Sequence, residues 1–134
     1  MNKKLILIAL TITAASLFFL GIYNPVSYDT KKIDMHLTVG SYTGFNVDSD
    51  AVYFGTIMPY GIGTRTINIT NLDKMSLVNM KVYGDMKGWI YVSENNFILG
   101  PNENKDVRIM IYVPKDAEYK NYEGELKIRF IKQK

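Results

Sequence analysis

The chain has 134 residues, of which 47% are hydrophobic and 22% charged, so its composition is that of an ordinary globular protein with one domain. Its lack of cysteine excludes disulfides, thiolate metal sites and cysteine nucleophiles. Sixteen Lys and Arg stand against thirteen Asp and Glu, and Lys3 and Lys4 supply two of the three surplus charges. The remainder is nearly neutral, which argues against nucleic-acid binding, because that function needs a concentrated basic face.

An apolar run of nineteen residues without a charge extends from Leu5 to Tyr23. As a helix it would be about 28 Å long, close to the roughly 30 Å of a bilayer's hydrocarbon core. This predicts one N-terminal transmembrane helix within residues 1–23. A cleaved secretory signal is the alternative, but its small residues should end the apolar region, and Thr13–Ser16 lies in the middle of it. The side chains expected to anchor the chain in the lipid bilayer are Leu5, Ile8, Ile12, Leu17, Phe18, Phe19 and Leu20.

The charges around this run predict the orientation of the chain in the membrane. Lys3 and Lys4 favour a cytoplasmic N-terminus, although Lys31 and Lys32 on the other side weaken the asymmetry. We therefore expect a single-pass protein of the cytoplasmic membrane with its C-terminal domain on the external side. Residues 24–34 are polar and are predicted to be a tether that reaches at most about 40 Å.

Residues 35–134 show the period of two that is typical of strands with one buried face. In the clearest strand, Asp106–Val113, Val107, Ile109, Ile111 and Val113 should point to the core. Seven to nine short strands with no helical pattern between them predict a mainly β fold, an antiparallel sandwich of two sheets, with an open barrel as the alternative. The other expected strands are Met35–Val39, Gly44–Val47, Val52–Ile57, Thr64–Asn71, the runs around Val78–Val82 and Leu126–Phe130, Trp89–Ser93 and Asn96–Leu99.

Several local patterns resemble immunoglobulin-like domains of the Hydin and major-sperm-protein type. They are Phe54-Gly55-Thr56-Ile57, the strand ending Thr70-Asn71, Leu99-Gly100-Pro101-Asn102-Glu103, Val107 to Pro114, and Tyr122-Glu123-Gly124-Glu125-Leu126. The sequence is also similar to the immunoglobulin-like domains of prokaryotic, particularly archaeal, surface proteins. The resemblance covers Val52 to Phe130 and implies an adhesion, docking or scaffolding module without a catalytic motif.

Residue types that carry chemistry are sparse. His36 has no second histidine or cysteine to form a metal site of the usual type, and Asn46–Asp50 begins like a calcium loop but lacks its glycine and its bidentate glutamate. Glu123 and Glu125 have a spacing that a glycosidase could use, but Lys127 and Arg129 beside them favour a solvated strand face. We therefore expect no enzyme activity, no cofactor and no metal.

Surface recognition is the better-supported role. Asn68 begins a glycosylation sequon on the outward side of its strand. Ten tyrosines are present, and the expected partner contacts among them are Tyr60, Tyr91, Tyr112 and Tyr122. Trp89 is either a core anchor or a presented contact, and the alternation leaves both open.

The sequence thus predicts a membrane-anchored, non-catalytic binding or scaffolding protein that presents its sandwich to another membrane or envelope protein. A subunit of a surface filament is one alternative, although Lys3-Lys4-Leu5 lacks the glycine of a pilin processing site. An accessory subunit of a larger membrane complex is the other, and a homo-oligomer is also left open.

Overall fold

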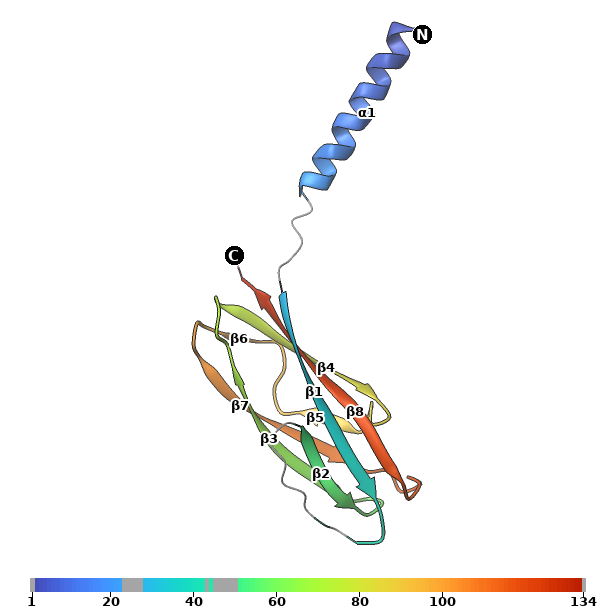
Figure 1. The fold of residues 1–134 in the computed structure, drawn as a ribbon, viewed down its shortest axis with the longest axis vertical. Coiled ribbons are helices and arrows are strands. Elements are labelled where there is room, and N and C mark those ends of the chain that lie inside the picture. Colours follow the sequence, from blue (N-terminus) through green and yellow to red (C-terminus); the bar gives the residue numbers. More distant parts are fainter. Residues whose placement is uncertain (1, 23–27, 43, 45–50, 134) are drawn as a thin grey trace.

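The fold is described from a computed structural model, for residues 2–22, 28–42, 44 and 51–133. One helix precedes a body made of strands (Figure 1). The elements are α1 (Lys3–Ile22), β1 (Tyr28–Val39), β2 (Val52–Ile57), β3 (Ile62–Thr70), β4 (Ser76–Gly84), β5 (Ile90–Val92), β6 (Phe97–Leu99), β7 (Asn104–Tyr112) and β8 (Asn121–Lys132).

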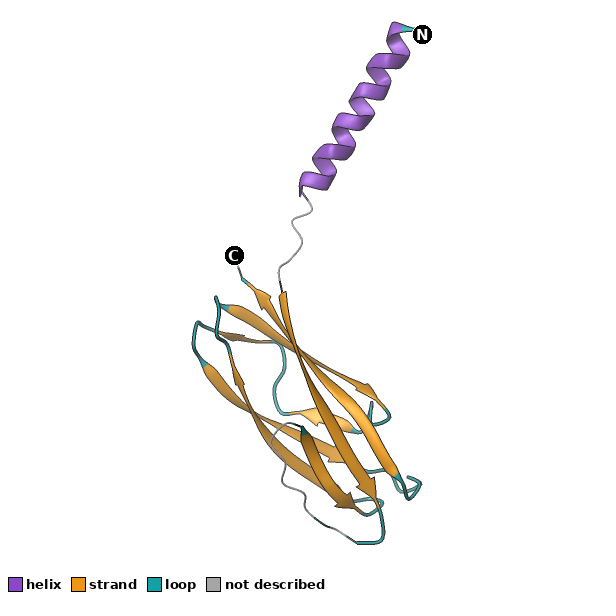
Figure 2. Ribbon diagram, in the orientation of Figure 1, coloured by secondary structure: helices purple, strands orange, loops and turns teal. Residues whose placement is uncertain are grey.

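The strands form two layers (Figure 2). The larger sheet has the order β2-β1-β8-β4-β6, and the smaller sheet has the order β3-β7-β5. The prediction of a mainly β, two-sheet fold is therefore confirmed, with eight strands among the described residues. All pairs are antiparallel except β1 and β2, which are parallel. The connection over residues 40–51 is long enough to return the chain to the same end of the sheet, as a parallel pair requires.

The core lies between the layers and follows the predicted alternation. Val107, Ile109 and Ile111 of β7 are wholly buried, and Val113 follows at the end of the strand. The larger sheet supplies the other side of the core, mainly from β1, β4 and β8. Its most deeply buried apolar side chains include Met35, Leu37, Val39, Val78, Leu126 and Ile128.

The predicted tether is wrong over Tyr28–Asp34, because these residues are the first half of β1. They pair with β8 from Ile131 to Glu125. This half of the strand lies at the end of the sandwich, where the described side chains are largely exposed. Charged residues such as Lys31, Lys32 and Asp34 therefore occur on both of its faces, and the sequence shows no alternation there. The strand is decided by its partner β8, which lies almost a hundred residues away in the chain.

Two further sequence predictions are corrected or limited by the structure. Of the expected strand Gly44–Val47, only Gly44 is described, and it forms an isolated bridge with Thr56. The order of the sheets places the first strand, β1, beside the last, β8, whereas immunoglobulin constant domains place those strands in different sheets. The immunoglobulin-like type therefore stays a prediction.

Candidate interaction surfaces

The smaller sheet carries an aromatic and apolar cluster on its outer face, which we call the tyrosine patch: Ile62, Tyr91, Met110 and Tyr112. These residues alternate along the strands with buried ones, since Met110 and Tyr112 flank Ile111 on β7. Strand register brings them together, with Ile62 opposite Tyr112 and Tyr91 opposite Met110. The sequence predicted Tyr91 and Tyr112 as partner contacts, but only strand pairing places the four side chains in one group.

The geometry of the tyrosine patch is that of an open recognition surface. The rings of Tyr91 and Tyr112 meet edge to face, with their centroids 5.3 Å apart. Tyr91 is 54% exposed and Ile62 is 62% exposed. A shallow hollow is lined by Tyr91, Val92, Ser93, Met110 and Tyr112. Such amphipathic rings with free hydroxyl groups are the side chains that protein interfaces enrich.

The two other tyrosines predicted as partner contacts, Tyr60 and Tyr122, differ in exposure. Tyr60 is 76% exposed and stands in a turn with a φ of 64°, close to the tyrosine patch in the chain. Tyr122 is only 7% exposed, so the prediction that it belongs to an exposed surface is wrong. It lies on the inward side of β8 with Leu126, and its hydroxyl donates to the Glu118 carbonyl oxygen at 3.0 Å.

Of the two alternatives for Trp89, the structure favours a place against the core. It is partly buried, and its ring lies 4.9 Å from that of Tyr122, tilted by 52°. Tyr122 in turn is hydrogen-bonded to Glu118 in the loop that follows β7. Because Trp89 precedes β5, its orientation is set by the turn rather than by the alternation of a strand.

Asn68 lies on the outer face of β3, as the alternation predicts, and its side chain is exposed. Its amide nitrogen donates to Asp106 Oδ1 at 2.8 Å, and its amide oxygen accepts a hydrogen bond from Thr70 Oγ1 at 3.0 Å. The Asp106 contact uses one of the two Nδ2 hydrogens, and a glycan attached at Asn68 Nδ2 would replace the other. Modification of Asn68 stays a prediction.

His36 lies on the outer face of β1 and stacks on Tyr53, with a centroid distance of 4.9 Å. Its Nδ1 is 3.9 Å from the Glu123 carboxylate, and Lys32 Nζ is 3.9 Å from that of Glu125. Within the part of the chain that the structure describes, no cluster of three or more His, Cys, Asp or Glu side chains is arranged to hold a metal ion. The predicted polar loop Asn46–Asp50 falls outside the described residues.

A partly polar hollow of about 420 Å³ opens at the end of the sandwich nearest α1. Asn71, only 2% exposed, donates through Nδ2 to the carbonyl oxygens of Lys74, Leu99 and Gly100. At its rim the Lys132 ammonium donates to the Asp73 carboxylate at 2.7 Å, which lowers the pKa of Asp73 and raises that of Lys132. Asn71, Asp73 and Lys132 are thus all paired with other protein groups. We therefore interpret the hollow as a gap where loops meet at this end of the sandwich.

Helix α1 projects away from the two sheets (Figure 1). Its described side chains are exposed, including the predicted anchor residues Leu5, Ile8 and Ile12. The side chains of the other four, residues 17–20, lie outside the described part of the chain. Over the described residues, no helix combines the length and the apolar character needed to cross a membrane, so the predicted span is not confirmed.

Comparison of the chain with protein-family models, with curated proteins and with solved structures found no match.

Proposed function

We propose that the chain is a membrane-attached, non-catalytic binding protein whose sandwich engages another membrane or envelope protein through the tyrosine patch. The observation that carries the proposal is the exposure of apolar surface at two separate places. Leu5, Leu7 and Leu10 are each more than 60% exposed on α1, and Ile62 and Tyr91 are more than half exposed on the smaller sheet. Apolar surface on this scale marks sites that another phase or molecule covers.

Attachment by α1 follows from the first of these places. The uncharged sequence continues from Leu5 to Tyr23, beyond Ser16, the last residue of the helix whose side chain is described. A lipid bilayer is the environment that removes such side chains from water without a matching protein groove. Because Lys3 and Lys4 precede the run, we place the sandwich on the external side of the cytoplasmic membrane.

We propose that the fold is an immunoglobulin-like sandwich in which β1, the first strand of this chain, occupies the position of the last strand, G, of an immunoglobulin domain. In space, β4-β8-β1 corresponds to the C-F-G order of that fold, and β3-β7-β5 corresponds to B-E-D. The strand beside β8 then comes from the start of the domain instead of its end. This assignment leaves the outer face of the smaller sheet open for binding.

Membrane attachment predicts that charges placed in α1 release the chain. Leu7→Asp with Leu10→Asp should move the protein from the membrane pellet to the supernatant after an alkaline carbonate wash, because an aspartate in the hydrocarbon region costs about 3 kcal/mol. Leu7→Ala with Leu10→Ala, the matched control, should stay in the pellet. Recovery of the unmodified chain in the supernatant would refute attachment.

Partner binding predicts that the tyrosine patch dominates capture. Tyr91→Ser with Tyr112→Ser should weaken binding by roughly several hundredfold, since aromatic anchors in interfaces often contribute about 2 kcal/mol each and two of them are removed. Affinity purification of the full chain from native membranes in mild detergent measures the effect, which should change little with salt. Tyr42→Ser with Tyr119→Ser removes two rings that are more exposed than those of the patch, and it should leave capture intact.

Undiminished capture by the patch variant would contradict this site. If the patch variant keeps capture and the variant with aspartates in α1 loses it, recognition belongs to the helix. The chain would then be better described as an accessory subunit whose helix packs inside a larger complex.

A further inference from the structure

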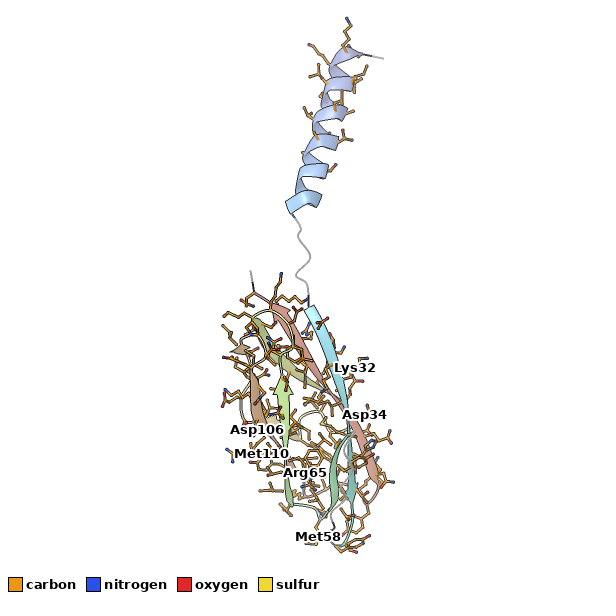
Figure 3. All side chains as sticks on the ribbon, turned by 60° about the vertical axis from the view of Figure 1, so that its left-hand side comes forward. Lys32, Asp34, Met58, Arg65, Asp106 and Met110 are labelled. Carbon is orange, nitrogen blue, oxygen red and sulfur yellow. The ribbon has the colours of Figure 1, made fainter. Side chains whose placement is uncertain are left out.

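The outer face of the larger sheet carries its side chains in rows that cross the strands, and the rows differ in character. Nearest α1 is an apolar row, and next come Asn79, Arg129 and Thr30 in register. A row of lysines follows, and beyond it lies an acidic row in which Asp34 stands opposite Glu125. Figure 3 shows Lys32 nearer the α1 end of β1 than Asp34. The apolar row is Ile98, Leu77 and Ile131, and the lysine row is Lys81, Lys127 and Lys32.

The lysine row concentrates positive charge against the usual rule for sheets. Lys127 stands directly opposite both Lys81 and Lys32, and like charges directly opposite each other destabilise a strand pair. Compensation is weak, because Lys32 Nζ is 3.9 Å from Glu125 and Lys127 Nζ lies 5.2 Å from the centre of the Tyr83 ring. Among the described residues no carboxylate lies within ion-pair distance of Lys81. Local rules are broken in this way mainly at functional sites.

The rows follow the same order as the layers of a bilayer surface. Moving away from α1, the face passes from apolar through cationic to anionic, as a bilayer passes from hydrocarbon through phosphate to water. Successive rows are two residues apart, or about 7 Å. Residues 23–27 can extend over at most about 20 Å between Ile22 and Tyr28. The apolar and lysine rows are therefore within reach of any membrane that holds α1.

We propose that the lysine row, with Arg129, binds the phosphate headgroups of an anionic bilayer, while the apolar row contacts the bilayer's interfacial region. The proposal rests on the attachment of α1 described above, and it adds a second contact that fixes how the sandwich stands on the membrane. Charge selects this occupant, since the adjacent acidic row would repel a nucleic acid that extended past the lysines. The outer face of the smaller sheet, with the tyrosine patch, then remains free for a protein partner.

The absence of cysteine allows one reporter to test the contact. Ile98→Cys, at a position 58% exposed in the apolar row, carries a fluorophore on the full chain. The chain is inserted into phosphatidylcholine vesicles, with or without about one third phosphatidylglycerol, that contain a quencher attached to the lipid headgroup. We expect strong quenching only in the anionic vesicles, and its loss at roughly 1 M salt, where charges are screened within about 3 Å.

Matched variants identify the lysines responsible. Lys32→Gln, Lys81→Gln and Lys127→Gln together should reduce quenching to the level seen in phosphatidylcholine. Each lysine near an anionic surface should contribute about a fivefold change in binding. The control removes the same charge by Lys87→Gln, Lys115→Gln and Lys120→Gln at the other end of the strands, and should quench as the parent does. Circular dichroism checks that both variants keep the parent's strand content.

Four other outcomes would each overturn the proposed headgroup contact. Equal quenching in both vesicle types excludes a headgroup contact through charge, and equal loss in the two triple variants shows a net-charge effect only. Quenching removed by inorganic phosphate but not by chloride of equal ionic strength indicates a site for free phosphate. Quenching that changes with protein density at constant lipid indicates that a second copy covers the face. Failure of the chain to sediment with either vesicle refutes attachment by α1 instead.

Discussion

Replacing Ile111 with aspartate should unfold the sandwich, whereas Arg108→Asp should leave it folded. Ile111 is fully buried between the sheets on β7, and Arg108 lies three residues earlier on the outer face. An unpaired charge in this core costs several kcal/mol. That cost is comparable to the whole free energy of unfolding of a small domain, roughly 5–15 kcal/mol.

Urea unfolding of the two variants, followed by circular dichroism in mild detergent, measures the difference. Ile111→Asp should show no cooperative transition, and Arg108→Asp should have a midpoint near that of the parent chain. Ile111→Val, which keeps the site apolar, is the control and should cost only about 1 kcal/mol. The reverse outcome, in which Arg108→Asp unfolds the chain and Ile111→Asp is tolerated, would mean that the register of β7 is displaced by one residue.

A chain that begins at Met35 should not fold, although a chain that begins at Tyr28 should. The first half of β1, Tyr28–Asp34, forms seven register pairs with β8. At roughly 0.5–1.5 kcal/mol per backbone hydrogen bond, their loss approaches the whole stability of a domain of this size. It also exposes Ile33, which is partly buried against the core.

Two-dimensional amide NMR spectra of the two shortened chains distinguish these outcomes. Dispersed resonances are expected for residues 28–134, and a collapsed spectrum is expected for residues 35–134. Asp34→Ser within residues 28–134 changes one outward side chain of this half-strand and should keep the dispersion. Dispersed spectra from both chains would show that Tyr28–Asp34 is a tether after all and that its pairing with β8 adds little.

The strands and the buried faces of most of them were predictable from the sequence, because alternation is a local property. Val107, Ile109 and Ile111 follow one another at every second position, and any sheet that buries one of them buries all three. The same local logic placed Asn68 and Tyr112 on outer faces. No information about a partner strand was needed for any of these predictions.

The alternation of apolar and polar residues stops where a strand passes from the core to the exposed end of the sandwich. Prediction from the local sequence failed at such places. Asp29–Lys32 is polar at every position, so that only pairing with β8 reveals the first half of β1 as a strand. Tyr122 stands at the beginning of β8 on the inward side, although the amphipathic character of tyrosine had suggested a place on a recognition surface. Its burial depends on Trp89, which packs against it from a different part of the chain.

The sequence by itself therefore determined the class of fold, the clearest buried face and the scarcity of groups for catalysis. The tertiary structure decided which residues meet on a surface. Lys32, Lys81 and Lys127 are about fifty residues apart along the chain, and the tyrosine patch combines residues of β3, β5 and β7. The physical reason is that a period of two fixes the side of a sheet on which a residue lies, whereas the neighbour across the sheet is fixed by strand order and register.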